Sequence, residues 1–318
     1  MTAGIKAIEY YLPEKVLSND ELSSVFPDWT PEKIFEKTGI RNRHICQDDE
    51  CASDLAVKAA EKLFISGAIS RKDIDFLILA TQTPDYILPT TACMIQDRLG
   101  LPKTCGAFDF NLGCSAFVYG LAVSKGLISA GIARNILFIT SETYSKHINP
   151  LDKSTRTIFG DGAAAVLVSE GGHILGEFDL CTDGSGYDKL IIHSGGARKA
   201  GSKDDLYMSG TDIFNFTISA VPESVGTALR KNGLNISDID VFVFHQANKF
   251  MLDYLRKKIG ILEDKFIIDI EDTGNTVSST IPIVLKRSEE KCLIKKGYKV
   301  LICGFGVGLS WGSAVIEW

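Results

Sequence analysis

Two short segments of this 318-residue sequence recur about half a chain length later, and this internal repeat constrains the fold more than any other feature. The segment DIDFLILA, which begins at Asp73, returns as DIDVFVFH, which begins at Asp238. The segment NILFI, from Asn135, corresponds to KVLIC, from Lys299, at nearly the same shift. Because two separate apolar segments give nearly the same shift, we expect a duplicated structural unit.

Short β-branched or aromatic runs alternate with longer amphipathic stretches, which favours an α/β fold with helices covering a largely parallel sheet. We therefore expect two related α/β halves, at residues 1–170 and 171–318. Ser53 is the expected N-cap of a helix whose apolar side chains recur at helical spacing, at Ala56, Ala59, Ala60 and Leu63. The expected strands are 75–81, 107–112, 135–141, 240–245 and 299–304.

A duplicated α/β unit also predicts where a functional site lies. Ligands of open parallel sheets bind outside the carboxyl ends of the strands, where helix N-termini also point. If the sequence is shifted so that Asp73 aligns with Asp238, Cys114 aligns with Ser279. Each of these two residues precedes an apolar helical pattern. Two halves packed back to back would direct two helix N-termini to one shared site.

Cys114 is a candidate nucleophile because it lies between an expected strand and a small, apolar helix, in the segment NLGCSAFVYGL. The positive end of a helix stabilises a thiolate, so this position predicts a lowered cysteine pKa. The alternative is a small buried cysteine with no chemical role.

His245 and Asn275 are the other candidate catalytic residues. His245 directly follows an expected strand in the segment HQAN, so its ring should emerge at the carboxyl end of that strand. Asn275 lies in GNT, where Gly-Asn is also a common turn dipeptide. The alternatives are a histidine bonded to a local carbonyl and an ordinary turn residue.

Two glycine-rich segments carry a weaker signal. CGFGVGLSWGSAVIEW predicts a strand, a tight turn and a returning strand, in which glycines allow close backbone approach. It is not a dinucleotide fingerprint, because no helix and no acidic residue follow it at the required positions. FGDGAA, from Phe159 to Ala164, by itself is consistent with a simple turn into a strand.

Charge and cysteine spacing exclude several classes of protein. A net charge of −6 argues against a nonspecific nucleic-acid-binding protein. We find neither an apolar stretch of membrane-spanning length nor a signal peptide, and expect a cytoplasmic protein that does not bind a membrane. The eight cysteines show no metal-ligand spacing, so we expect free thiols and no metal.

Taken together, NLGCSAFVYGL, FGDGAAAVLV, HQAN, GNT followed by IP, and GFGVGLSWGSA resemble β-ketoacyl-acyl-carrier-protein synthase III, in the same order and over nearly the whole chain. The resemblance implies the thiolase fold, in which two pseudo-twofold-related α/β halves form a five-layered αβαβα architecture. It also implies a homodimer that uses acyl-CoA or acyl carrier protein thioesters and no cofactor.

By this resemblance Cys114 accepts the acyl group, and His245 and Asn275 stabilise the enolate formed when a malonyl thioester loses carbon dioxide. The backbone N–H groups of Cys114 and Val307 would form the oxyanion hole. These roles suit the chemistry, because a thiolate is both a strong nucleophile and a good leaving group. Loss of one oxyanion donor typically costs about 3 kcal/mol of transition-state stabilisation.

The resemblance also implies residues that contact the substrates. Those of the substrate and coenzyme A channel are Lys37, Thr38, Leu88, Met208, Phe214, Asn248 and Phe305. Those that would dock the carrier protein are Lys249, Arg256, Lys257 and Lys258.

Three positions depart from the family pattern. Lys33 replaces a tryptophan that stacks on adenine, with Trp29 nearby in the sequence, Phe250 replaces a docking arginine, and Leu88 replaces a large aromatic at the dimer interface. These departures predict a specialised member for which acetyl-CoA is a poor primer.

Two alternatives to decarboxylative condensation remain. The acyl group on Cys114 could pass to a hydroxyl or amine acceptor, with His245 as general base. A noncatalytic protein would require the catalytic trio to be a relic. Hydroxymethylglutaryl-CoA synthase shares the trio but needs a glutamate in the region that here reads ATQTPDYILP, with Gln82.

Overall fold

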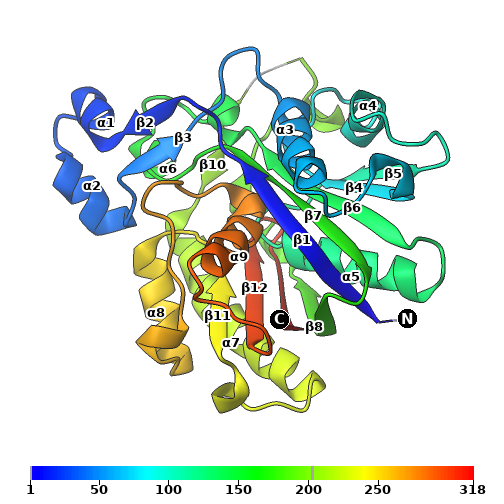
Figure 1. Ribbon diagram of the computed structural model, residues 1–318. Helices are drawn as coiled ribbons and strands as arrows, with labels where there is room; N and C mark the ends of the chain where they lie inside the picture. Colours follow the sequence, from blue (N-terminus) through cyan, green and yellow to red (C-terminus); the bar gives the residue numbers. More distant parts are fainter. Residues whose placement is uncertain (1, 202–203) are drawn as a thin grey trace.

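The strands of the two halves join in one hydrogen-bonded sheet, in the order β11-β12-β13-β8-β1-β7-β6-β4-β5 (Figure 1). The structure, a computed structural model, describes residues 2–201 and 204–318. The strands of this sheet are β1 (Ala3–Tyr11), β4 (Phe76–Ala80), β5 (Gly106–Phe110), β6 (Asn135–Glu142), β7 (Gly162–Glu170), β8 (His173–Thr182), β11 (Val241–Phe244), β12 (Lys299–Gly306) and β13 (Ser310–Glu317). Two small sheets pair β2 (Val16–Ser18) with β3 (Asn42–His44) and β9 (Leu190–Ile191) with β10 (Tyr207–Met208).

The two halves repeat the same strand pairing, which confirms the predicted duplication. In the first half β1 and β6 pair antiparallel with β7, and β6 pairs parallel with β4. In the second half β8 and β12 pair antiparallel with β13, and β12 pairs parallel with β11. The matching strands β4 and β11 begin at Phe76 and Val241, and β6 and β12 begin at Asn135 and Lys299, so the strand starts reproduce the shifts found in the sequence.

Helices cover the sheet in layers. The larger helices are α3 (Ala52–Ile65), α4 (Thr91–Arg98), α5 (Ala116–Ser129), α7 (Gly210–Lys231), α8 (Lys249–Ile259) and α9 (Thr280–Glu290). The shorter ones are α1 (Asn19–Val25), α2 (Pro31–Thr38) and α6 (Lys153–Arg156). Helices α3 and α4 pack on the outer face of the first-half strands, α7 and α8 on that of the second-half strands, and α5 and α9 lie between the halves (Figure 1). The result is the predicted αβαβα architecture of the thiolase fold. The prediction of a largely parallel sheet is wrong, because five of the eight neighbouring strand pairs in the order above are antiparallel.

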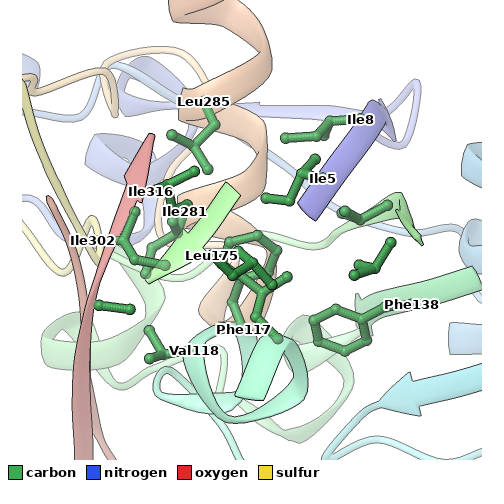
Figure 2. Close-up of a cluster of buried hydrophobic side chains, with 14 of the residues drawn as sticks. Ile5, Ile8, Phe117, Val118, Phe138, Leu175, Ile281, Leu285, Ile302 and Ile316 are labelled. Carbon is green, nitrogen blue, oxygen red and sulfur yellow. The ribbon is translucent and has the colours of Figure 1, made fainter. Parts of the chain in front are cut away.

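The central core is formed where α5 and α9 meet strands from both halves (Figure 2). Phe117 of α5 stacks on Phe138 of β6 with ring centroids 5.8 Å apart, and Ile281 of α9 lies in the same cluster as Ile302 of β12. Each such side chain stabilises the fold by about 1.5–3 kcal/mol when it is removed from water. This shared core fixes the two helix N-termini relative to each other.

Helix α3 begins slightly earlier than predicted. Its N-cap is Cys51, whose backbone N–H donates to Asp54 at 2.7 Å, whereas Ser53 lies within the first turn and donates its hydroxyl to Asp85 at 2.6 Å. The prediction of Ser53 as the cap is therefore wrong, because its oxygen serves a tertiary contact. The predicted apolar stripe of this helix is fully buried.

The boundary between the halves coincides with a sharp change of direction. Strand β7 ends at Glu170 and β8 begins at His173, and β1 pairs with β8 through Gly4 and Ile174. The division at residues 170 and 171 stays a prediction. Within the part of the chain described here, no helix is long and apolar enough to cross a membrane.

Candidate active site

Cys114 lies in a strand-turn-helix elbow between β5 and α5, as predicted. The helix is capped by Ser115, and Cys114 directly precedes this cap with 6% of its surface exposed. In the second half the cap of α9 is Ser279, with a backbone conformation close to that of Ser115. Since the two caps correspond, the counterpart of Cys114 is Ser278, and the predicted match with Ser279 is displaced by one position.

The C-terminal hairpin packs directly on this elbow. A Cβ atom added to Gly306 would lie 3.0 Å from the Cys114 Sγ, and one added to Gly304 would lie 2.7 Å from the Cys114 carbonyl oxygen. Only glycine therefore allows β12 to approach so closely. Strands β12 and β13 form the predicted strand, turn and returning strand, with Gly306 opposite Ser310.

The electrostatic surroundings of Cys114 differ from the prediction. Burial raises the pKa of its thiol above the usual value, and the nearby carboxyl of Glu142 raises it further. This direction is opposite to the effect of a helix N-terminus, so the predicted lowering of the pKa is wrong. The largest cause is the loss of solvent around the thiol, which lies in a largely apolar cavity.

His245 follows β11 and is held there by neighbouring groups of the second half. Its backbone N–H donates to the Cys303 carbonyl at 2.8 Å, and its Nδ1 lies 2.8 Å from the Thr280 Oγ1. The ring of Phe305 packs edge to face against the imidazole, with centroids 5.5 Å apart. Burial lowers the pKa of His245 to about 3, so the imidazole is neutral at physiological pH.

Asn275 precedes a 3₁₀ turn that spans Val277–Ser279. Its side-chain oxygen accepts from the Val277 N–H at 2.9 Å, and its Nδ2 donates to the Ala247 carbonyl at 3.4 Å. A parallel bridge also pairs Asn275 with Phe159, which places the FGDGAA segment beside the site. These contacts fix the amide plane, and an amide nitrogen has a second hydrogen to donate.

One cavity of about 270 Å³ brings the three candidate residues together from both halves. Six predicted residues line it, namely Cys114, Met208, His245, Asn248, Asn275 and Phe305. The sequence analysis missed other lining residues, namely Ser154, Ile158, Phe159, Leu190, Gly210, Ile213, Ala247, Met251 and Gly306. Most of these are apolar, which suits an acyl chain.

Several predicted substrate residues do not line this cavity. The hydroxyl of Thr38 donates to the Ile34 carbonyl at 2.8 Å. The ring of Phe214 packs against Phe250, with centroids 5.8 Å apart. Val307 lies at the hairpin turn directly after Gly306 of the lining, and Leu88 is 80% exposed and is not part of the lining.

The predicted residue Lys37 lies with two other lysines around the indole ring of Trp29. The ammonium nitrogens of Lys33, Lys37 and Lys153 lie 5.9, 5.7 and 5.5 Å from the centre of the Trp29 ring. Because Lys153 directly precedes Ser154 of the cavity lining, this cluster lies beside the site. It places one aromatic face and three positive charges together.

The predicted docking residues all belong to α8, but their surroundings differ. Lys249 pairs with Asp253 at 2.5 Å, and the largely buried side chain of Arg256 pairs with Glu263 at 3.3 Å. Lys257 and Lys258 are exposed. Lys249 and Lys257 line a shallow groove, together with Phe35, Glu36, Phe250, Asp253 and Tyr254.

Two polar residues beside the site were missed. Thr280 contacts the ring of His245, and the fully buried Glu142 ends β6 close enough to raise the pKa of Cys114. A signal existed for Glu142, since it follows the predicted strand 135–141 at its carboxyl end, where ligands bind in parallel sheets. Nothing in the sequence distinguished Thr280.

The described residues, 2–201 and 204–318, contain no group of three or more His, Cys, Asp or Glu side chains placed to hold a metal ion. All eight cysteines are free.

The fold and the site define a condensing enzyme of the thiolase type: two related halves supply a buried cysteine, a neutral histidine and an asparagine to one cavity. Two family models, for 3-oxoacyl-[acyl-carrier-protein] synthase III and for its C-terminal part, match residues 108–184 and 229–318. The chain belongs to the β-ketoacyl-[acyl-carrier-protein] synthase III family, a family of acyltransferases.

Relatives cover the chain from end to end. It is 38% identical to the β-ketoacyl-[acyl-carrier-protein] synthase III of Caldanaerobacter subterraneus subsp. tengcongensis, over all of this chain and 98% of that protein. A crystal structure of a 3-oxoacyl-(acyl-carrier-protein) synthase III superposes with a TM-score of 0.98 at 46% identity, with both chains fully covered. The synthase III of Pseudomonas aeruginosa PAO1 gives a TM-score of 0.93 at 34% identity, over all of this chain and 98% of that one.

Proposed function

We propose that this enzyme loads an acyl group on Cys114 and condenses it with a malonyl group carried by acyl carrier protein. The products are a 3-oxoacyl thioester, carbon dioxide and a free thiol. The observation that carries this proposal is the single cavity that joins Cys114, His245 and Asn275 from the two halves. The names of its relatives, which are synthases of this type, support the same reaction.

In the first step the Cys114 sulfur attacks the carbonyl carbon of an acyl thioester. A bond forms between Sγ and the acyl carbon, the donor's carbon–sulfur bond breaks, and the donor thiol leaves with the proton of Cys114. The oxyanion of the tetrahedral intermediate would be stabilised by the backbone N–H groups of Cys114 and Val307. The close approach of the β12 glycines to the elbow supports this assignment.

In the second step the malonyl group loses carbon dioxide, and the electron pair of the broken bond moves into an enolate. The enolate carbon attacks the acyl carbonyl, and Cys114 leaves as a thiolate. His245 and Asn275 would donate to the enolate oxygen as neutral groups. In this role Nε2 of His245 would carry the hydrogen that faces the cavity, and Nδ1, which lies 2.8 Å from the Thr280 Oγ1, would be the unprotonated ring nitrogen.

Coenzyme A and carrier protein thioesters are the proposed substrates, and no metal or redox cofactor takes part. The cluster of Trp29 with Lys33, Lys37 and Lys153 suits the base and phosphates of a nucleotide. Lys249, Lys257 and Lys258 suit an acidic carrier surface, and Arg256 contributes less because its side chain is largely buried and paired.

We also propose a cytoplasmic homodimer. Ile87 and Leu88 lie in one loop with 88% and 80% of their surfaces exposed, and adjacent apolar side chains of this kind are typical of an interface. In a dimer Leu88 would reach the partner's acyl pocket. Light scattering should give twice the chain mass of 34.7 kDa, and a fully active monomer at micromolar concentration would refute the dimer.

Two measurements test the proposed reaction. Intact mass after incubation with a panel of acyl-CoA and acyl carrier protein donors detects the thioester. Release of carbon dioxide from malonyl-acyl carrier protein then distinguishes condensation from acyl transfer to a hydroxyl or amine. A loaded enzyme that releases no carbon dioxide would overturn the proposal.

A further inference from the structure

A single turn holds both side chains that would stabilise the enolate. Within Val277–Ser279 the Val277 N–H donates to the side-chain oxygen of Asn275 at 2.9 Å. The next residue, Thr280, places its Oγ1 2.8 Å from Nδ1 of His245 and 3.1 Å from the Val277 carbonyl oxygen. A shift of this turn would therefore move Asn275 and His245 together.

The turn adopts a backbone conformation that needs external support. Val277 has φ of 54°, in the left-handed region that a β-branched residue rarely occupies. Such a conformation persists where surrounding contacts hold it in place. The turn is fully enclosed, with each of Val277, Ser278 and Ser279 at most 1% exposed.

The support comes from the other half of the molecule. Oε1 of Glu142 accepts from the Ser278 hydroxyl at 3.0 Å, and Oε2 accepts from the Gln82 N–H at 3.0 Å and from the Thr83 hydroxyl at 3.3 Å. The adjacent Ser279 bonds to Thr140 of the same strand, with 2.9 Å between their side-chain oxygens. Hydrogen bonds from Ser278 to Glu142 and between Ser279 and Thr140 thus hold the turn against the end of β6; we call these bonds the clamp.

Glu142 also reaches the cysteine elbow through Gln82. The side-chain oxygen of Gln82 lies against Gly113, where an added Cβ atom would clash with it. One buried carboxyl therefore bonds to segments on both sides of the cavity. Neither contact places Glu142 on the cavity wall, so it would act through its neighbours.

We propose that Glu142 is a positioning residue for the condensation step, and that it acts through Ser278 on the turn that orients Asn275 and His245. This inference rests on the proposed function, because it assigns those two residues to the enolate. Acylation uses the cysteine elbow and the oxyanion hole, so it should depend much less on this clamp.

The charge state of the Glu142 carboxyl is consistent with this positioning role. Burial raises the pKa of Glu142 to about 8, although hydrogen bonds from Gln82, Ser278 and Thr83 act in the opposite direction. Asp161 also raises this pKa, and in its ionised form the carboxylate in turn raises the pKa values of Cys114 and Tyr144. A largely neutral carboxyl adds little negative charge beside a developing enolate, and an amide can take its place.

The test separates the two half-reactions in Ser278→Ala, Glu142→Gln and Glu142→Ala. Acylation is measured by the rate of mass gain, and decarboxylation by carbon dioxide release from malonyl-acyl carrier protein on pre-acylated enzyme. The matched control is Asp179→Asn, since Asp179 is a buried carboxyl that bonds to Ser224 and Lys231 away from the turn. Thermal unfolding identifies any variant that is not folded.

Ser278→Ala should lower decarboxylation about tenfold while acylation stays within about twofold of the wild type. Glu142→Gln should retain most of the wild-type decarboxylation, and the Asp179 control should change neither rate. In a double variant, Glu142→Ala should add little to the loss of decarboxylation caused by Ser278→Ala, because both changes break the same link to the turn.

Equal losses in the two half-reactions, or no loss in Ser278→Ala, would overturn the positioning role. Fully additive effects of the two alanine substitutions would overturn the route through Ser278. If the wild-type enzyme itself releases no carbon dioxide, the proposed function fails and the inference fails with it. The wild-type measurement therefore distinguishes the two failures.

Discussion

The two helix N-termini that meet at the cavity have the same geometry and different chemistry. Ser115 before α5 and Ser279 before α9 have φ and ψ angles of −83° and −12° against −86° and −8°. The residue before each cap is Cys114 in the first half and Ser278 in the second. The two equivalent positions thus carry the proposed nucleophile in one half and a hydroxyl that bonds to Glu142 in the other.

The difference lies in what each position faces. Cys114 faces the cavity beneath the glycines of β12, whereas Ser278 is turned into the protein and bonds to Glu142. In the proposed mechanism the first elbow presents the reactive sulfur, and the second holds the turn beside Asn275. The comparison teaches that a pseudo-symmetric fold can divide reaction and positioning between its halves.

The largest expected effect on this comparison comes from removing the proposed nucleophile. Cys114→Ala should lower acylation by at least about a thousandfold, because no other group in the described cavity lining forms the thioester. Peptide mapping of the wild type should place the acyl group on Cys114. The exposed Cys93 supplies the control, since Cys93→Ala should load normally. An adduct on Cys93 or Cys303 with Cys114 unmodified would contradict the assignment.

The second prediction tests the two proposed enolate donors, which belong to the second half. His245→Ala and Asn275→Ala should still acquire an acyl group, but should lose decarboxylation by about 10²–10³-fold, the usual effect of removing an oxyanion donor. Carbon dioxide release from a malonyl donor measures the loss. A variant that decarboxylates at the wild-type rate would show that its residue has no part in the enolate step.

The third prediction uses pH to distinguish the protonation states of Cys114 in the first half and His245 in the second. Because burial raises the pKa of Cys114, the thiol is protonated near neutrality, and its acylation rate should rise about tenfold per unit between about pH 5.5 and 7. The pKa of His245 is lowered to about 3, so the imidazole stays neutral across this range. Decarboxylation by pre-acylated enzyme should then change less than about twofold. A fall in that rate with an apparent pKa near 6.5 would contradict the assigned state of His245.

The smallest expected effect concerns the nucleotide end of coenzyme A. Restoring the aromatic residue in Lys33→Trp should improve loading from acyl-CoA donors about fivefold, at the low end of base stacking on an aromatic side chain. Lys72→Trp, at an exposed lysine of the first half, is the matched control. The wild type should load acetyl-CoA more slowly than a carrier-bound or nonacetyl acyl group. Fastest loading from acetyl-CoA, with no change in Lys33→Trp, would identify an ordinary fatty-acid initiator.

The sequence was sufficient for the overall architecture because the local patterns that specify the fold occur twice. The two repeated segments correspond to the strand pairs β4 with β11 and β6 with β12. The signal was weaker at helix ends, where Ser53 has the side chain of a good cap but bonds to Asp85 instead. Whether a side chain caps a helix depends on which hydrogen-bond partner lies nearest in space. A partner that is distant in the sequence leaves no signal in the local sequence.

The sequence by itself also identified three residues that line one cavity, since Cys114, His245 and Asn275 each follow a strand or turn signal. Only the tertiary structure decided their electrostatic states and their support. Burial by residues from both halves raises the pKa of Cys114 and lowers that of His245, against what a helix N-terminus alone predicts for the thiol. The link from Glu142 to Ser278 joins residues 136 positions apart. Such effects depend on distances through space, which periodicity and local propensity do not encode.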